Sequence, residues 1–237
     1  MRRLERAVST HGGSVGGVNS DTSHTLDVNT SLGMSRLTVD AAADAHSVLW
    51  LGHGAGGGIE ALDLAALAAT LPARGITVVR YEQPWRLAGK KVAPRPAALD
   101  AAWLEVAPIV RTIHAGIPLI TGGRSAGARV ACRTAEAVSA AAVICLAFPL
   151  HPPAHPERSR ADELLMPRVP VLVLQGERDA FGSADLVASA IADTESITTV
   201  SIPGADHSMA VLKSSPYTPE STANLITASV AAFIERL

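Results

Sequence analysis

The sequence has few cysteines and almost no excess of charge of either sign. Its 237 residues include only two cysteines, Cys132 and Cys145, which lie in segments that predict a helix and a buried strand. Thiols in such positions are typical of small core residues in a reducing compartment and do not indicate a disulfide-stabilised secreted domain. The 20 basic and 22 acidic side chains nearly balance, so the charge gives no reason to expect a nucleic-acid partner.

Long hydrophobic runs are missing as well. The longest, around residues 140–150, is too short to span a bilayer and ends in prolines, so no membrane partner is expected. Arg2, Arg3 and Arg6 are not followed by the apolar stretch of a signal peptide, and we therefore expect a cytoplasmic protein. Residues 1–22 are rich in Gly, Ser, Asn and Thr without periodicity, which predicts a disordered leader before a single domain over residues 23–237.

From residue 23 onward, patterns typical of strands and helices take turns. A hairpin is predicted over residues 24–39, with Gly33 in its turn. Continuous apolar runs then predict a mostly parallel sheet of about eight strands with helices on both faces, an α/β fold. These further strands are expected at residues 47–51, 76–80, 117–121, 141–147, 169–174 and 197–202. Apolar stripes predict helices over residues 64–71, 99–113 (with a kink at Pro108) and 226–237.

Residues 122–127, Gly-Gly-Arg-Ser-Ala-Gly, place Ser125 in a G-x-S-x-G frame between a predicted strand and a predicted helix. A sharp turn of this kind lifts a serine hydroxyl above the sheet edge, and side chains two residues to either side would clash. Gly123 and Gly127 remove that clash. The pattern predicts a nucleophile elbow with Ser125 as the nucleophile, and Arg124 beside it is a candidate for salt-bridging the elbow or lining a pocket.

An acid and a histidine follow at the ends of two later strands. Asp179 comes after the strand predicted at residues 169–174, and His207 after the strand at residues 197–202. The order Ser, Asp, His is that of α/β-hydrolases and differs from the orders in chymotrypsin-like and subtilisin-like enzymes. The sequence therefore predicts a triad in which Asp179 orients His207 and His207 activates Ser125.

A glycine-rich loop, residues 52–58, follows the strand at residues 47–51. Such a loop can present backbone N–H groups, and we expect an oxyanion hole made by the N–H of Ala126 and that of Ala55, with Gly56 as the alternative donor. His53 is expected to order the loop rather than to perform acid–base work.

The same loop also satisfies G-x-G-x-x-G, and Glu82 follows the next predicted strand, as in a Rossmann-type dinucleotide-binding domain. This alternative is disfavoured because it leaves Ser125, Asp179 and His207 unexplained.

Several residues at predicted strand ends could line a substrate pocket. The candidates are His53, Gly56, Trp85, Arg86, Arg124 and Phe148. The basic loop formed by Lys90, Lys91 and Arg95 is more simply a solvated surface than a site for an anionic group.

No metal site or cofactor site is expected. His151 and His155 lie four residues apart, but the prolines between them exclude the helix that would bring them together. The segment between the strands at 141–147 and 169–174 is too short for a cap domain, which predicts an open site for a small acyl substrate.

Four motifs carry a resemblance to a known family: Gly52-His-Gly-Ala-Gly-Gly57, Tyr81-Glu-Gln-Pro-Trp-Arg86, Gly122-Gly-Arg-Ser-Ala-Gly127 and Gly204-Ala-Asp-His207. From residue 24 onward the chain resembles the α/β-hydrolase superfamily and, within it, the small lidless dienelactone-hydrolase-like family. A subgroup of that family includes a mammalian testis-expressed protein and a subunit of the non-specific lethal histone acetyltransferase complex. Dienelactone hydrolases proper have a cysteine nucleophile where this chain has Ser125.

The resemblance implies an eight-stranded sheet, the triad and hydrolase activity, and names no substrate. We expect a serine hydrolase that acts on a small carboxylic ester or thioester without a cofactor. The alternative is a hydrolase-fold scaffold that binds a protein partner without turnover, against which the complete triad argues.

Overall fold

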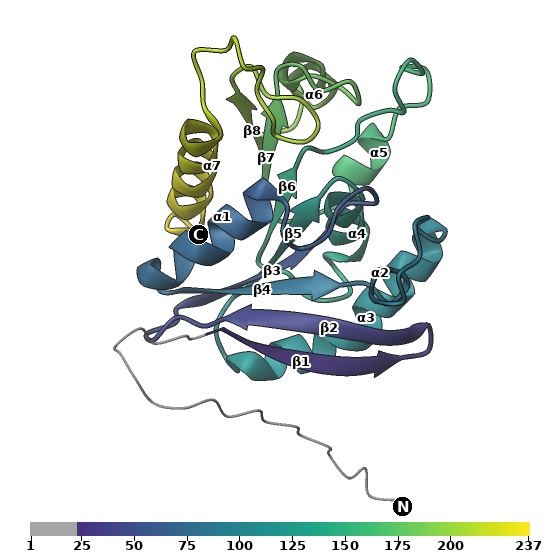
Figure 1. Cartoon of the computed structure of the whole chain (residues 1–237), viewed down its shortest axis with the longest axis vertical. Helices are drawn as coiled ribbons and strands as arrows, with labels where there is room; N and C mark the ends of the chain where they lie inside the picture. Colours follow the sequence, from purple (N-terminus) through teal and green to yellow (C-terminus); the bar gives the residue numbers. More distant parts are fainter. Residues whose placement is uncertain (1–22) are drawn as a thin grey trace, which may run out of the picture.

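The computed structural model describes residues 23–237, which form one eight-stranded sheet with helices on both sides (Figure 1). The leader predicted over residues 1–22 lies outside the described residues. The strands are β1 (Ser23–Thr30), β2 (Gly33–Asp40), β3 (Ser47–Gly52), β4 (Ile76–Glu82), β5 (Leu119–Arg124), β6 (Ala142–Leu146), β7 (Val171–Gly176) and β8 (Ile197–Ile202).

The strand order is β1-β2-β4-β3-β5-β6-β7-β8. The hairpin β1–β2 is antiparallel and joins β4 in antiparallel fashion, whereas the strands from β4 to β8 are all parallel. This arrangement confirms the predicted mostly parallel sheet, and it differs from the 3-2-1-4-5-6 order of a Rossmann domain, so the dinucleotide-binding alternative is wrong. Because parallel strands share one carboxyl edge, the loops after β3, β4, β5, β6, β7 and β8 meet along one side of the molecule.

The helices divide between the two faces of the sheet. They are α1 (Leu62–Thr70), the 3₁₀ turn η1 (Leu71–Arg74), α2 (Pro84–Leu87), α3 (Pro96–Ile113), α4 (Ala126–Thr134), α5 (Ala161–Leu164), α6 (Ala184–Ala190) and α7 (Pro219–Ile234). Side chains of α1, η1 and α7 share one buried apolar cluster, and those of α3, α4 and α6 share the other (Figure 1). β3, β5, β6 and β7 are buried along their whole length, which explains their continuous rather than alternating apolar sequences.

Some sequence predictions differ from the structure at element boundaries. β5 begins and ends two or three residues later than expected, because the strand continues through the glycines to Arg124. Helix α3 runs through Pro108 without ending, and the short helices α2 and α6 had no predicted counterpart. Between β6 and β7 the chain forms only the four-residue helix α5, so no cap domain covers the carboxyl edge there. Within residues 23–237, no helix is both long enough and apolar enough to cross a membrane.

Candidate active site

Ser125 occupies a strained turn between β5 and α4. Its backbone has φ 51° and ψ −106°, a combination that a residue with a side chain rarely adopts. A Cβ atom added at Gly123 would lie 2.5 Å from the Gly52 carbonyl oxygen, and one added at Gly127 would collide with the same oxygen. The Ser125 N–H donates to the Leu146 carbonyl at 2.9 Å and thereby ties the turn to β6. The two glycines let β3, β5 and α4 approach closely enough to hold this turn.

Ser125, His207 and Asp179 form one chain of hydrogen bonds. The Ser125 Oγ lies 2.9 Å from His207 Nε2, and His207 Nδ1 lies 2.8 Å from Asp179 Oδ2. Asp179 has a fully buried side chain, whereas the His207 side chain is 22% exposed and Ser125 is partly exposed. The three residues come from loops after β5, β7 and β8, which the shared carboxyl edge of the sheet brings together. In this geometry the Nδ1–H of His207 faces the carboxylate and leaves Nε2 to accept the serine proton.

Every oxygen of the Asp179 carboxylate has a donor. Besides His207, Oδ2 accepts from Gln175 Nε2 at 3.0 Å, and Oδ1 accepts from the Phe181 N–H at 2.8 Å. The buried Gln175 amide is held by the carbonyl groups of Phe148 and Gly182. This network fixes the carboxylate in one orientation because all of its neighbours are donors.

The imidazole of His207 is also held from its face. The Phe181 ring stacks on it with centroids 4.0 Å apart and an interplanar angle of 28°. The stack restricts rotation of the ring without using either ring nitrogen, so both nitrogens stay aligned with Ser125 and Asp179.

Arg124 connects the elbow with two distant segments. Its Nη1 donates to Asp63 Oδ2 at 2.9 Å, and its Nη2 donates to the His207 carbonyl at 2.5 Å. Asp63, in the first turn of α1, is completely buried. Of the two roles predicted for Arg124, the structure shows the salt bridge at the elbow. The guanidinium holds the loop of His207 against the turn of Ser125.

Replacing Arg124 with methionine should destabilise the protein by about 3–5 kcal/mol, because the buried Asp63 carboxylate would lose its counter-charge. Urea-induced unfolding measures this loss. The matched control is Arg36→Met, which breaks an exposed pair with Asp27 and should cost less than about 1 kcal/mol. The double variant Asp63→Leu, Arg124→Met should recover much of the loss, and a double variant as unstable as Arg124→Met would contradict this account.

His53 supports the loop over residues 52–58. Its Nε2 accepts from the Gln83 N–H at 3.2 Å, so Nδ1 carries the proton and donates to the Gly54 carbonyl at 2.8 Å. Burial lowers the pKa of His53 from its ordinary value of 6.5, which keeps the ring neutral. Gly54 packs beside the nucleophile, since a Cβ atom added there would lie 3.5 Å from the Ser125 Cβ. His53 therefore fixes the loop without carrying a charge.

The lowered pKa of His53 makes the stability of the protein depend on pH. Once the pH falls below about 6.5, the unfolded chain takes up a proton at His53 that the folded protein does not, so stability decreases by up to about 1.4 kcal/mol per pH unit. The difference in free energy of unfolding between wild type and His53→Asn should narrow from pH 7.5 to pH 5.5. Urea titrations at both values measure it, and a constant difference would show that His53 does not cause the loss.

Two backbone N–H groups of the predicted oxyanion hole are unpaired among the described residues. Ala126 is the first residue of α4, directly after Ser125, and Ala55 is an exposed residue of the loop that Gly54 anchors. Within the described part of the chain neither N–H donates to another group. Gly56 is also exposed, and a Cβ atom there would have no neighbour within 4 Å.

The other predicted pocket residues lie in different surroundings. Trp85 is buried against His53, with ring centroids 5.6 Å apart, and the Arg86 guanidinium lies beside Gly58 of the loop. Phe148 is fully buried in the apolar core, so its ring does not line an accessible pocket. In the region that the structure describes, no three His, Cys, Asp or Glu side chains gather as metal ligands.

Sequence reasoning missed four residues of this site: Asp63, Gln83, Gln175 and Phe181. Gln175 had a signal, because it is a polar residue at the end of an apolar strand just before Asp179. Asp63 had none, because its partner Arg124 is 61 residues away in the chain.

Comparison with known proteins identifies the family. Residues 45–235 match the model of a family described as the alpha/beta hydrolase domain. The chain belongs to this family. No curated protein sequence matches it significantly. The family assignment agrees with the predicted superfamily, and it makes this α/β-hydrolase an enzyme of the hydrolase class.

Solved structures share the fold at low sequence identity. XC6422 from Xanthomonas campestris, described as a serine hydrolase without a lid, is 20% identical with a TM-score of 0.68, over 92% of this chain and 98% of its own. An alpha-beta serine hydrolase homologue from Coxiella burnetii is 16% identical with a TM-score of 0.70, over 91% and 100%. Est1E from Butyrivibrio proteoclasticus is 15% identical with a TM-score of 0.69, over 89% and 99%. The α/β-hydrolase fold thus covers nearly the whole described chain.

Proposed function

We propose that this α/β-hydrolase is a serine hydrolase that cleaves small carboxylic esters or thioesters through an acyl-enzyme intermediate. The observation that carries the proposal is the continuous chain from Ser125 Oγ through His207 to Asp179, with both distances below 3 Å. Such a chain is the arrangement by which an imidazole base turns a serine hydroxyl into a nucleophile.

The first step of the reaction forms an ester with the enzyme. His207 Nε2 takes the proton of Ser125 as Oγ attacks the substrate carbonyl carbon, and the imidazolium that forms is stabilised by Asp179. The proton then passes from His207 to the leaving alcohol or thiol, whose bond to the carbonyl carbon breaks. In the second step His207 removes a proton from water, the hydroxide attacks the acyl-enzyme, and Ser125 regains its proton as the acid leaves.

The negative charge on the carbonyl oxygen in each tetrahedral intermediate needs donors. The N–H groups of Ala126 and Ala55 are the proposed pair, since both have no internal acceptor among residues 23–237. Loss of one such donor in other enzymes reduces turnover by about two to three orders of magnitude. We therefore propose that His53, which holds this loop, affects turnover by fixing the position of the Ala55 N–H.

The substrate is proposed to be small. The segment between β6 and β7 leaves the carboxyl edge without a cap domain, and the partly exposed Ser125 offers no enclosed tunnel for a long chain. Est1E has been solved with ferulic acid bound, which shows that this fold can hold a small aromatic acid. Arg86, beside the loop and without a carboxylate partner among the described residues, is a proposed contact for a polar substrate group.

From its sequence patterns we also propose that the protein belongs to the small lidless dienelactone-hydrolase-like family, in the subgroup with the testis-expressed and non-specific-lethal-complex proteins. We likewise propose a cytoplasmic location and a single domain over residues 23–237. A serine at position 125 argues against the reaction of dienelactone hydrolases proper, which use a cysteine.

Labelling with a fluorophosphonate tests the proposal. The folded protein should gain one phosphonyl group, found on Ser125 by peptide mapping, and heat-denatured protein should gain none, because only the assembled triad activates the hydroxyl. Labelled and unlabelled protein would then be compared on acetyl and butyryl esters and thioesters. Absence of labelling in folded protein would favour the protein-binding scaffold instead.

A further inference from the structure

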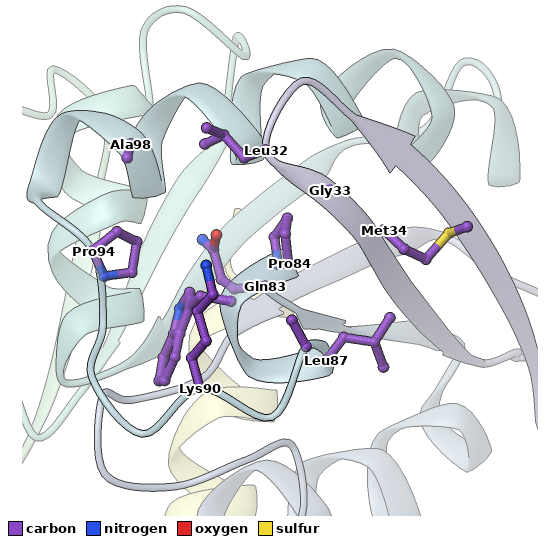
Figure 2. A pocket seen from close by; sticks show the side chains of 11 residues that line it. Leu32, Gly33, Met34, Gln83, Pro84, Leu87, Lys90, Pro94 and Ala98 are labelled. Atoms are coloured by element: carbon purple, nitrogen blue, oxygen red, sulfur yellow. The ribbon is translucent and has the colours of Figure 1, made fainter.

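A cavity of about 340 Å³ lies at the same edge of the sheet as the triad, and Figure 2 shows the residues that line it. Its walls come from the β1–β2 turn, from α2 with the loop that follows, and from the first turn of α3. Neither Ser125 nor Asp179 nor His207 lines it. The volume falls within the range of small-molecule sites, roughly 300–1,000 Å³.

Most of the cavity wall is apolar. It is lined by Leu32 from the β1–β2 turn, Met34 from β2, Leu87 from α2, Pro94 from the loop before α3, and Ala98 from α3 (Figure 2). Leu32 and Met34 are 47% and 42% exposed, so part of the apolar lining is in contact with water. An apolar ligand in the cavity would remove this surface from water.

Among residues 23–237, Lys90 is the only charged residue that lines the cavity, and it is exposed. Figure 2 shows it extending from its loop toward Gln83, across the apolar lining. No carboxylate lies within 4 Å of its amine in the described chain, and Lys91 and Arg95 add positive charge to the same loop. An unpaired ammonium at the edge of an apolar cavity selects a ligand with an apolar body and one anionic group.

Two residues, Gln83 and Trp85, separate the cavity from the loop over residues 52–58. Gln83 and Trp85 line the cavity, and both also contact His53 on their other side, through the Gln83 N–H and the packing of the rings. A ligand in the cavity would therefore touch the support of the loop rather than the reacting atoms. The indole N–H of Trp85 is buried and has no acceptor among residues 23–237.

We propose that this cavity is a second binding site, separate from Ser125, for a small amphipathic carboxylate. The alkyl or aryl body fills the space between the β1–β2 turn and α3, and the carboxylate pairs with Lys90. The site does not depend on the proposed catalytic function, because none of its residues belongs to the triad.

Calorimetric titration of the full chain with octanoate tests the proposal, with the neutral octanamide as the matched ligand. Lys90→Gln should raise the Kd for octanoate by about threefold to fivefold and leave that for octanamide unchanged, since only the carboxylate loses a partner and Lys90 is exposed. Lys91→Gln is the control, because Lys91 is an exposed neighbour outside the wall. Ala98→Trp should fill the cavity and raise the Kd for both ligands at least tenfold. Ala97→Trp, at an exposed position outside the wall, should leave both Kd values unchanged.

Three outcomes decide the question, with thermal unfolding used to show that each variant is folded. A separate site is supported if octanoate binds one-to-one, if Lys90→Gln and Ala98→Trp weaken this binding as stated, and if the binding persists after Ser125 has been phosphonylated. Binding unchanged in both Lys90→Gln and Ala98→Trp, or no binding to wild type, overturns the site. Binding that disappears when Ser125 is phosphonylated places the ligand in the catalytic pocket and also overturns it. The Lys90 and Ala98 variants stay informative if Ser125 does not label.

Discussion

Ser125→Ala should lose about 10⁶-fold in kcat on any ester or thioester that the wild type cleaves. Removal of the nucleophile leaves His207 and Asp179 without a group to activate, and in serine proteases such a loss is as large as removal of the whole triad. Steady-state kinetics on a short acyl ester, with fluorophosphonate labelling of the same preparation, measures the effect.

The control for this variant is Ser208→Ala. Ser208 is exposed next to His207, and only its backbone N–H makes a hydrogen bond, to Asp206. Its replacement should leave kcat and labelling within about twofold of the wild type. Turnover that survives in Ser125→Ala at a tenth of the wild-type rate would show that another group carries the reaction.

Asp179→Asn should lower kcat about 10⁴-fold at neutral pH while the protein stays folded. One carboxylate oxygen accepts from both His207 and Gln175, and the other accepts from the Phe181 N–H. An amide has only one acceptor end, so either orientation of the asparagine brings a donor against a donor. If its NH₂ faces His207, the ring must present a lone pair at Nδ1 and carry its proton at Nε2, where it can no longer accept from Ser125.

Asp206→Asn is the matched control for Asp179→Asn. Asp206 lies next to His207, and a single oxygen, Oδ1, accepts from the N–H groups of Ser208 and Ala210. An asparagine can keep both bonds through its carbonyl oxygen, so kcat should change less than about threefold. Equal losses in the two variants would mean that loop geometry, and not the tautomer of His207, limits the rate.

The elbow and the triad residues could be predicted from the sequence because each is recognised from a short segment of the chain. Gly123, Ser125 and Gly127 fall within five residues, and the close approach of the Gly52 carbonyl explains why neither glycine position tolerates a side chain. The apolar runs before Ser125, Asp179 and His207 place the three residues at strand ends. A parallel sheet then brings these ends together whatever the loop lengths.

The contacts that hold these residues in place depend on segments far apart in the chain. Arg124 meets Asp63 across 61 residues and the His207 carbonyl across 83. Nothing in the spacing of these residues specifies their pairing, because it depends on how α1 and the loop after β8 pack over the same strand end. The full burial of Phe148 likewise depends on its neighbours in the core, so a pattern at a strand end could not separate it from a pocket residue.

The sequence by itself determined the α/β class, the mostly parallel sheet, the elbow at Ser125 and the order of the candidate triad, because periodicity, glycine spacing and strand-end positions are local properties. Only the tertiary structure decided the contacts of Arg124 with Asp63 and the His207 carbonyl, and the donors around Asp179. It also decided the hydrogen bonds of the uncharged His53 ring and the cavity beside Lys90. Each of these depends on burial and on partners from separate segments, and both are determined only when the chain has packed.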